Sequence, residues 1–257
     1  MDKLSVAIIT KNEEKNIARC LDSVKGLADE IVVVDSFSTD STRDLCLERG
    51  AKFSEHPFAG HIEQKNHAFS LCKFNHILSL DADEALSDEL YASVLKAKER
   101  GFGDGYSMNR RTRYCGKWIR FGGWYPDRKI RLVRKDAFAW AGQNPHDELM
   151  SRAPVKVAHL KGDLLHYSIN SLDDHRRVVE NFSTIAAKAM FQKNLRPGPI
   201  KKYASAVFKF LQSYIVRLGF LEGIHGWNIA RLSAKSKYLK YKKLELMYKG
   251  DKASRNQ

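Results

Sequence analysis

The first hundred residues alternate between short apolar runs and segments with helical periodicity. Runs typical of buried strands occupy residues 4–10, 30–35, 51–56 and 75–81. Segments whose apolar residues recur at helical spacing lie between them, at residues 12–26, 42–50 and 63–72. Because a strand, helix and strand in this order almost always form a right-handed crossover between parallel strands, the pattern predicts an open α/β sheet.

The remainder of the chain changes its pattern twice. A helix is predicted from Ser87, a good N-cap, to about Gly101. Residues 101–170 then mix short strands with arginine and tryptophan, and from Asp173 the helical spacing returns. We therefore predict a sheet domain at residues 1–170, made of halves 1–100 and 101–170, and a helical region at 171–257.

The positive charge of the chain is concentrated in that last region. Residues 1–150 contain 23 Lys and Arg against 23 Asp and Glu, whereas residues 151–257 contain 21 against 7, so the whole net charge of +14 lies there. At 43% hydrophobic and 29% charged residues the composition is that of a globular protein. The asymmetry predicts a surface for anionic partners, which are phosphate-bearing lipids or nucleic acid.

The cysteines and apolar segments exclude several classes of protein. The four cysteines include no Cys-x-x-Cys pair, which argues against structural zinc and against a disulfide scaffold. No uninterrupted apolar segment reaches the length of a transmembrane helix, and the first residues lack the pattern of a signal peptide. We therefore expect a cytoplasmic protein.

Two aspartates follow the strand predicted at residues 75–81. Asp81 and Asp83 fall where a parallel strand meets solvent, which is the edge at which open α/β sheets bind ligands. Paired carboxylates there suit a divalent cation that also binds a diphosphate. A chain with this many aspartates contains an Asp-x-Asp about once by chance, so the pattern alone is weak. No glycine-rich phosphate loop follows any strand, which leaves a metal as the means of neutralising a diphosphate.

Four motifs in order carry a specific resemblance. They are Thr10-Lys-Asn-Glu13, Val32-Val-Val-Asp-Ser-Phe-Ser-Thr-Asp-Ser-Thr42, Gln64-Lys-Asn66 and Leu80-Asp-Ala-Asp-Glu84. Together they resemble the signature of family 2 glycosyltransferases. The resemblance implies a GT-A fold, which is a Rossmann-like, mostly parallel sheet with flanking helices, here followed by the basic helical region.

The resemblance also implies a donor site. The residues that would bind a nucleotide sugar are Thr10, Asn12, Glu13, Asp35, Asp40, Gln64, Lys65 and Asp81. The residues that would hold a divalent cation, Mn²⁺ or Mg²⁺, are Asp83, Asp81 and His166. The alternative is that Asn12 and Asp40 cap helices, that Asp35 ends a strand, and that His166 is structural.

Arginine and aromatic residues interleave in the half predicted to meet the acceptor. The candidates for acceptor binding are Arg110, Trp118, Trp124, Arg128, Arg131 and His146. Aromatic faces stack on sugars and Arg grips phosphate, so this mixture suits a glycan. It would also suit single-stranded nucleic acid, or a packed strand with solvated arginines.

A carboxylate is needed to accept the proton of the attacking hydroxyl. In glycosyltransferases of this type a His-Glu or Glu-Asp pair stands at the position of His146-Asp147. We therefore predict Asp147 as the catalytic base, with Glu148 as the rival.

Three further segments narrow the resemblance. Phe121-Gly-Gly-Trp-Tyr-Pro-Asp127, Arg131-Leu-Val-Arg134 and Gly219-Phe-Leu-Glu-Gly-Ile-His-Gly226 are similar to those of bacterial lipopolysaccharide inner-core β-1,4-glucosyltransferases. The implied reaction is inverting transfer of glucose from UDP-glucose to a heptose of the lipid-linked core. The alternatives are transfer to another cell-surface glycan and, in a different class, a nucleic-acid-binding module, although no nucleic acid is expected as a partner.

The tail offers a way to reach such an acceptor. Lysines alternate with Tyr238, Leu239 and Tyr241 in residues 235–243, and Tyr and Trp accompany apolar residues in residues 201–232. Basic amphipathic helices of this kind bind anionic membrane surfaces. We therefore expect peripheral association with the cytoplasmic face of the inner membrane; a helical cap with a solvated basic face stays as an alternative, and both can be true.

Overall fold

The computed structural model describes residues 1–143 and 146–255, with side chains described for residues 1–142 and 147–250. The chain divides into two compact units. The first unit contains residues 1–111 and 127–167, and the second contains residues 112–126 and 168–257. The sequence pattern predicts that residues 112–126 belong to the sheet domain, whereas in the structure they are grouped with the C-terminal helices.

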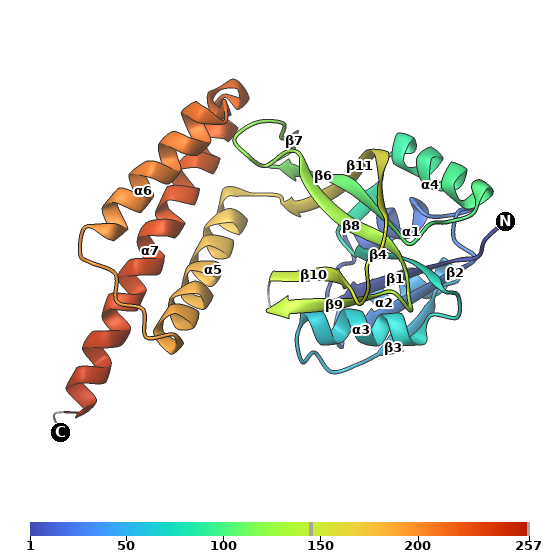
Figure 1. Cartoon of the computed structure of the whole chain (residues 1–257), viewed down its shortest axis with the longest axis horizontal. Coiled ribbons are helices and arrows are strands. Elements are labelled where there is room, and N and C mark those ends of the chain that lie inside the picture. Colours follow the sequence, from blue (N-terminus) through green and yellow to red (C-terminus); the bar gives the residue numbers. More distant parts are fainter. Residues whose placement is uncertain (144–145, 256–257) are drawn as a thin grey trace. The chain divides into compact units, whose positions relative to one another are not determined.

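The N-terminal part of the first unit is a parallel sheet, as predicted. Its strands are β1 (Leu4–Thr10), β2 (Glu30–Asp35), β3 (Lys52–Glu55) and β4 (His76–Asp81), in the order β3-β2-β1-β4 with all neighbours parallel. The connecting helices are α1 (Ile17–Asp22), α2 (Thr42–Glu48) and α3 (His61–Leu71). The predicted α/β fold with flanking helices is confirmed (Figure 1).

Antiparallel strands extend this sheet beyond β4. They are β8 (Asp127–Arg134), β6 (Gly105–Tyr114), β11 (Val157–Ile169) and β5 (Glu84–Leu86), in that spatial order, and β7 (Lys117–Trp118) pairs with the end of β6. Among the described residues, β9 (Phe138–Gln143) and β10 (His146–Ser151) form a separate antiparallel pair. The sheet is therefore mixed, with its parallel part at the N-terminal strands.

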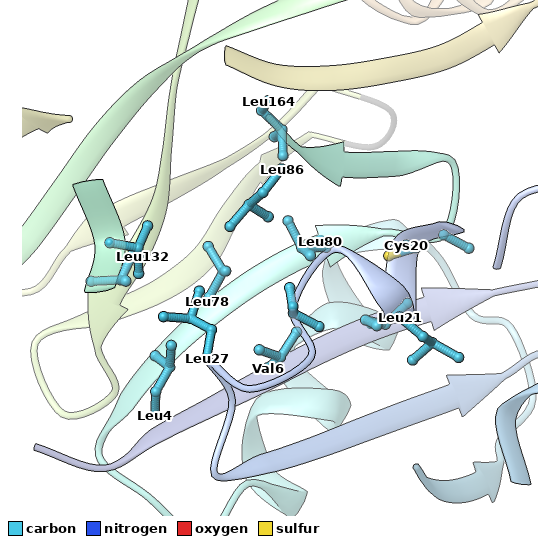
Figure 2. Close-up of a cluster of buried hydrophobic side chains, with 14 of the residues drawn as sticks. Leu4, Val6, Cys20, Leu21, Leu27, Leu78, Leu80, Leu86, Leu132 and Leu164 are labelled. Atoms are coloured by element: carbon cyan, nitrogen blue, oxygen red, sulfur yellow. The ribbon is translucent and has the colours of Figure 1, made fainter. Parts of the chain in front are cut away.

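Two apolar layers cover the two faces of the sheet. Alternate residues of β1 point to opposite faces, so that Val6 packs with α1, α2 and α4 (Asp88–Arg100) in one cluster. Figure 2 shows Val6 of this cluster together with Cys20 and Leu21 of α1. Ala7 packs in the other cluster with α3, and with Trp140 and Leu149 of β9 and β10. Asn66 of α3 holds β9 in place, because its side chain accepts the backbone N–H of Trp140 at 3.0 Å and donates to the carbonyl oxygen of Trp140 at 2.8 Å.

The second unit is helical. Its helices are α5 (Leu172–Gln192), α6 (Lys201–Leu211) and α7 (Ile224–Arg255), with a π-helical turn η1 (Gln212–Val216) and a 3-10 turn η2 (Gly219–Glu222) between α6 and α7. Ion pairs of 2.7 Å between Lys243 and Glu180 and of 2.8 Å between Lys202 and Glu245 tie α7 to α5 and to α6. No described helix has the length and apolar character needed to cross a membrane.

A small core near the start of α5 anchors residues 112–126 in this unit. Tyr114, Ile119 and Ile229 are buried together there. The hydroxyl of Tyr114 lies 2.9 Å from Nδ1 of His175, which is itself buried. Burial lowers the pKa of His175 to about 4 and raises that of Tyr114 to about 12. Both groups are therefore neutral near pH 7.

Candidate active site

The carboxyl ends of the parallel strands lie side by side at one edge of the first unit's sheet. Thr10 at the end of β1 stands opposite Asp35 at the end of β2, and Ile9 stands opposite Asp81 at the end of β4. The hydroxyl of Thr10 is buried and has no hydrogen-bond partner among the described residues. Because an unpaired buried hydroxyl is costly, this edge offers a bound molecule an unused polar group.

Asn12 and Asp35 hold the first two strand-end loops together. A carboxylate oxygen of Asp35 accepts the backbone N–H of Ser38 at 2.6 Å, and the hydroxyl of Ser38 accepts the backbone N–H of Asn12 at 2.7 Å. The amide oxygen of Asn12 accepts the backbone N–H of Thr39 at 2.8 Å. Both side chains therefore have a structural task, and their part in nucleotide binding stays a prediction.

Asp40 and Glu13 belong to the same pair of loops. The carboxylate of Asp40 accepts the hydroxyl of Thr42 at 2.6 Å and its backbone N–H at 3.1 Å, so Asp40 binds the first residue of α2, whose N-cap is Ser41. Burial raises the pKa of Glu13, while a hydrogen bond from Asn16 opposes that rise and the negative charge of Asp83 adds to it. The negative charge of the Asp-x-Asp segment therefore makes ionisation of Glu13 less favourable.

Gln64 fixes the start of α3 to the loop after β2. Its side-chain nitrogen donates to the hydroxyl of Ser36 at 3.1 Å, and its oxygen lies 2.9 Å from Nδ1 of His56. The side chain of Gln64 is fully buried. In this arrangement Gln64 supports the donor loops, and any direct contact with a nucleotide stays a prediction.

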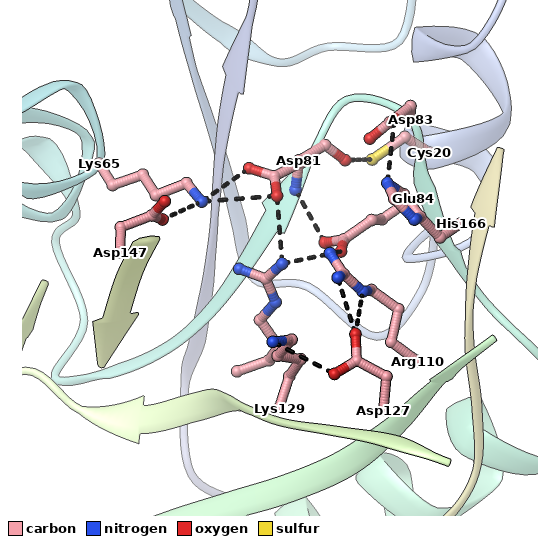
Figure 3. Close-up of polar contacts among 11 residues, drawn as sticks. Cys20, Lys65, Asp81, Asp83, Glu84, Arg110, Asp127, Lys129, Asp147 and His166 are labelled. Carbon is pink, nitrogen blue, oxygen red and sulfur yellow. Dashed lines mark hydrogen bonds and ion pairs between the residues drawn. The ribbon is translucent and has the colours of Figure 1, made fainter. Parts of the chain in front are cut away.

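The ammonium group of Lys65 lies between two carboxylates (Figure 3). Its Nζ is 3.0 Å from Oδ1 of Asp81 and 2.8 Å from Oδ2 of Asp147, and it stands 4.2 Å from the ring centroid of Trp140. The side chain of Lys65 is only 5% exposed. Since a buried charge is stable only when it is paired, these contacts hold Asp147 beside Asp81, although the two are far apart in the sequence.

Arg131 is buried in the same network. Its Nη2 is 3.1 Å from Oδ2 of Asp81 and 2.7 Å from Oε1 of Glu84. Burial alone would raise the pKa of Asp81, but the positive charges of Lys65 and Arg131 outweigh it and hold that pKa well below its usual range. The structure therefore places Arg131 inside an ion network, and its predicted contact with the acceptor stays a prediction.

A second arginine continues the network along β6 and β8. Nη2 of Arg110 is 2.7 Å from Oδ2 of Asp127, and its Nη1 is 3.6 Å from Oε1 of Glu84. Lys129 also contacts Asp127, at 3.2 Å. The network thus alternates carboxylates and cations from Asp147 through Glu84 to Lys129 (Figure 3).

Asp83 and His166 form a separate pair at this edge. Nε2 of His166 is 3.2 Å from Oδ2 of Asp83, and both side chains are partly exposed. Among the described residues, no group of three His, Cys, Asp or Glu side chains is arranged to hold a metal ion, because the carboxylate of Asp81 contacts Lys65 and Arg131 instead. The expected set of three ligands is therefore not assembled. A carboxylate and an imidazole still fit a divalent cation whose other ligands are diphosphate oxygens and water.

Asp147 and Glu148 lie on opposite faces of β10. Successive side chains of a strand alternate in direction, and Leu149, two residues after Asp147, is buried in the core against the sheet. Asp147 is 12% exposed and contacts Lys65, whereas Glu148 is exposed. Of the two candidates for the base, only Asp147 therefore points toward the Asp-x-Asp segment.

Comparison with known families bears on this arrangement. The sequence model of glycosyl transferase family 2 matches residues 5–157. These residues contain the whole ion network from Asp147 to Lys129 and both candidates for the base. The chain belongs to glycosyl transferase family 2.

Relatives of this glycosyltransferase extend over most of its length. An uncharacterized glycosyltransferase of Rickettsia typhi is 30% identical over 95% of this chain and 87% of its own. The lipopolysaccharide core biosynthesis glycosyltransferase LpsC of Rhizobium meliloti is 29% identical over 93% of each chain. A solved structure of glucosyl-3-phosphoglycerate synthase from Mycobacterium tuberculosis, in complex with Mn²⁺ and UDP-glucose, is 24% identical over 44% of each chain, with a TM-score of 0.36.

The acceptor candidates of the glycosyltransferase are distributed over both units. Arg110 and Arg128 belong to the first unit, and Trp118 and Trp124 to the second, where the ring of Trp124 lies 5.5 Å from that of Tyr114. The side chain of His146 lies outside the described residues. The acceptor-binding role of this set stays a prediction.

The predicted site residues did not include three members of the network, Glu84, Asp127 and Lys129, or the neighbouring Trp140. Glu84 is buried and accepts both the backbone N–H of Asp81, at 3.0 Å, and the guanidinium of Arg131. Its place directly after the Asp-x-Asp segment was a usable signal. The ammonium group of Lys65 lies over the ring of Trp140. That contact depends on how β9 packs on α3, which no local pattern in the sequence predicts.

Proposed function

We propose that this glycosyltransferase is an inverting enzyme that transfers glucose from UDP-glucose to a heptose of the lipopolysaccharide inner core, forming a β-1,4 linkage. The observation that carries the proposal is the position of Asp147, which Lys65 holds beside the carboxylates at the strand ends. The motif resemblance at residues 121–127, 131–134 and 219–226 supports the choice of reaction, and the name of the Rhizobium meliloti relative supports a lipopolysaccharide core as acceptor.

The donor would occupy the edge formed by β1, β2 and β4. The loops that contain Asn12 and Asp35 would hold its base and ribose, and the unpaired hydroxyl of Thr10 is available to it. Asp83 and His166 would hold Mn²⁺ or Mg²⁺ on the diphosphate. Such a cation supplies charge neutralisation for the leaving diphosphate.

The chain itself supplies the proton acceptor. As the acceptor hydroxyl attacks the anomeric carbon of glucose, its proton passes to a carboxylate oxygen of Asp147. The bond between the sugar and the phosphate oxygen breaks, and UDP leaves with the electron pair of that bond. Attack from the face opposite UDP converts the α donor into a β product. Lys65 contacts both Asp147 and Asp81, and would thereby hold the base beside the strand ends where the donor would bind.

The choice between the two candidate bases is tested by matched substitutions. Asp147→Asn should abolish transfer and leave the thermal stabilisation by UDP with Mn²⁺ intact, because the base acts on the acceptor rather than on the diphosphate. Glu148→Gln, on the exposed face of the same strand, is the control and should retain most of the activity. Loss of transfer in Glu148→Gln with activity retained in Asp147→Asn would assign the base to Glu148.

The donor and acceptor are tested separately. Thermal stabilisation across UDP-, GDP- and dTDP-sugars should be largest for UDP-glucose. Transfer to a purified heptose-terminated core, compared with other cell-surface glycans, then identifies the acceptor. A protein that no nucleotide sugar stabilises, but that binds single-stranded nucleic acid with a steep salt dependence, would contradict the proposal and favour the nucleic-acid-binding alternative.

A lipid-linked acceptor also requires contact with the membrane, and we propose the cytoplasmic face of the inner membrane as the place of action. The excess of 21 basic over 7 acidic residues in residues 151–257 supports binding to its anionic lipids. Not every lysine of the cluster at 235–243 is available for this, because Lys243 is bound to Glu180 and to the hydroxyls of Ser183 and Thr184.

A further inference from the structure

The second unit contains a cavity to which the proposed reaction assigns no role. It has a volume of about 410 Å³ and lies between residues 120–126 and the end of η1. Its basic side chains are Arg120 and Arg217, and the remaining lining is aromatic and aliphatic, including Phe121 and Val216. The cavity therefore combines a place for an anion with a place for apolar groups.

Buried hydrogen bonds fix one wall of this cavity. Oε1 of Glu222 accepts the backbone N–H of Arg120 at 2.7 Å and that of Phe121 at 3.0 Å. Glu222 is buried, and its other carboxylate oxygen is 2.7 Å from Nζ of Lys117. The one acidic side chain that holds this wall is therefore already neutralised by a lysine.

Two glycines bring the opposite wall into close contact. The backbone N–H of Gly122 donates to the carbonyl oxygen of Arg217 at 2.8 Å, and the hydroxyl of Ser213 donates to the carbonyl oxygen of Gly122 at 2.9 Å. Gly123 has φ +83°, and a Cβ there would lie 2.3 Å from Nη1 of Arg217. The positive φ favours glycine at this position, and without a Cβ there the side chain of Arg217 lies directly against the loop.

The positive charge at the cavity is not balanced by acids. Within the described part of the chain, the ion pairs include neither Arg120 nor Arg217, although Glu222 lies close by in the sequence. Burial lowers the pKa of Lys209, and the nearby charges of Arg217 and Lys237 lower it further. Several like charges thus gather without a counter-ion, which is a situation that a bound phosphate would relieve.

Exposed aliphatic side chains lie on the turns and the helix start that follow α6. Val216 is 74% exposed, Leu221 53% and Ile224 66%, and no described side chain of α6 is buried. Apolar surface of this extent is uncommon on a protein that meets only water. A polyanion such as nucleic acid would gain nothing from the aliphatic side chains, whereas a bilayer offers phosphate to the arginines and acyl chains to the aliphatic groups.

We propose that this cavity binds the phosphate of an anionic phospholipid headgroup, while the aliphatic side chains of η1, η2 and the start of α7 enter the acyl layer beside it. The inference rests on the proposed action at a membrane and names the surface that makes the contact. It shifts the main contact from the lysines at 235–243, in the middle of α7, to the C-terminal end of α6 and the turns that follow it (Figure 1).

The test compares two pairs of charge-removing substitutions in the full-length protein. Arg120→Gln with Arg217→Gln removes both charges at the cavity. Lys188→Gln with Lys193→Gln removes two exposed charges at the C-terminal end of α5. Co-sedimentation is measured with vesicles of phosphatidylcholine containing phosphatidylglycerol, and with phosphatidylcholine alone.

Wild type should bind the anionic vesicles and bind the neutral ones weakly. With about 1 kcal/mol for each basic residue at the surface, the cavity pair should weaken binding about thirtyfold and Arg120→Gln alone about fivefold. The control pair should change binding by less than about threefold, because those lysines lie away from the proposed contact.

Several results would overturn the proposal. Equal losses in the two pairs would mean that total charge alone governs binding, and failure of wild type to bind anionic vesicles would remove the partner. Stabilisation by inorganic phosphate that depends on Arg120 and Arg217, without vesicle binding, would assign the cavity to a soluble phosphate. If Arg217→Gln does not fold, the exposed Arg120→Gln decides the matter, because unchanged vesicle binding of that variant would refute the proposal. Stabilisation by UDP with Mn²⁺ is measured in parallel, and its absence in wild type would contradict the proposed transfer without bearing on the lipid contact.

Discussion

The contact of Lys65 with two carboxylates leads to a prediction about stability. Lys65→Met removes the ammonium group and keeps most of the side-chain volume against Trp140. Asp81 then retains Arg131, but Asp147 loses its described cationic partner. The substitution therefore tests whether this ion network holds the β9–β10 pair against α3.

The magnitude follows from the distances. At 3.0 Å to Asp81 and 2.8 Å to Asp147, each attraction is worth about 6 kcal/mol at an effective dielectric constant near 20. The desolvation of a side chain that is 5% exposed cancels much of this, and removing one partner of a buried pair costs about 3–5 kcal/mol. Because Arg131 still compensates Asp81, we expect the lower end, about 3 kcal/mol.

The assay is urea unfolding of wild type and variants, with the free energy of unfolding taken from the midpoint and slope. Lys3→Met is the matched control, since Lys3 also pairs with a carboxylate, Asp29, at 2.8 Å, but its side chain is 62% exposed and Asp29 keeps Lys98 as a second partner. That control should lose less than about 1 kcal/mol. Adding Asp147→Asn to Lys65→Met should restore about 1–3 kcal/mol, because the unpaired charge is then removed as well.

The refuting result is equally specific. If Lys65→Met and Lys3→Met lose the same small amount of stability, the buried network does not stabilise the first unit. If Asp147→Asn adds its own full cost to that of Lys65→Met, the two side chains are not coupled, and Lys65 does not position the proposed base.

Three further predictions concern other parts of the molecule. Asp83→Asn and His166→Ala should each abolish the part of UDP binding that depends on Mn²⁺ and leave metal-free uridine binding unchanged, as isothermal titration can measure. The pKa of His175 is about 4 in the folded state against 6.5 ordinarily, so the contribution of neutral His175 to stability is fully present above pH 6.5. It is lost as the pH falls toward 4, by about 3 kcal/mol. Urea unfolding across that range should show a free energy of unfolding that decreases with falling pH, and His175→Gln should abolish that decrease. Ser87→Ala should cost about 1 kcal/mol in thermal unfolding, because the Ser87 hydroxyl accepts the backbone N–H of Leu90 at the start of α4, and restoration by Ser87→Asp is the expected control.

The parallel part of the sheet could be predicted because its signals are local. The strands that end at Thr10, Asp35 and Asp81 are continuous apolar runs, and parallel strands bring their carboxyl ends to one edge. The beginning of α1 was less predictable. Helical spacing suggested a start near Asn12, but Asn12 has φ +54° and the helix begins only at Ile17, because the intervening residues form the loop that contacts Ser38.

The ion network could not be predicted, because its members come from elements that lie far apart in the chain. Lys65 is on α3, Asp147 is on β10 and Arg131 is on β8, and only the packing of β9 and β10 on the helix brings them together. Sequence patterns report which residues are buried on one element, but they carry no information on which charges from three elements neutralise one another. The sequence therefore did not show that Arg131 is a buried partner of Asp81 and Glu84, and its predicted acceptor-binding role stays a prediction.

The charges at the strand ends also indicate where a cation would be accepted. The network contains four carboxylates and four cations, namely Asp81, Glu84, Asp127 and Asp147 with Lys65, Arg110, Lys129 and Arg131, so it is balanced in itself. Asp83 is outside this balance, since its described partner is an imidazole, and its charge adds to the raised pKa of Glu13. Of the two aspartates of the Asp-x-Asp segment, Asp83 therefore lacks a lysine or arginine partner among the described residues, and we propose that a divalent cation on a diphosphate would be bound more favourably at Asp83 than at Asp81.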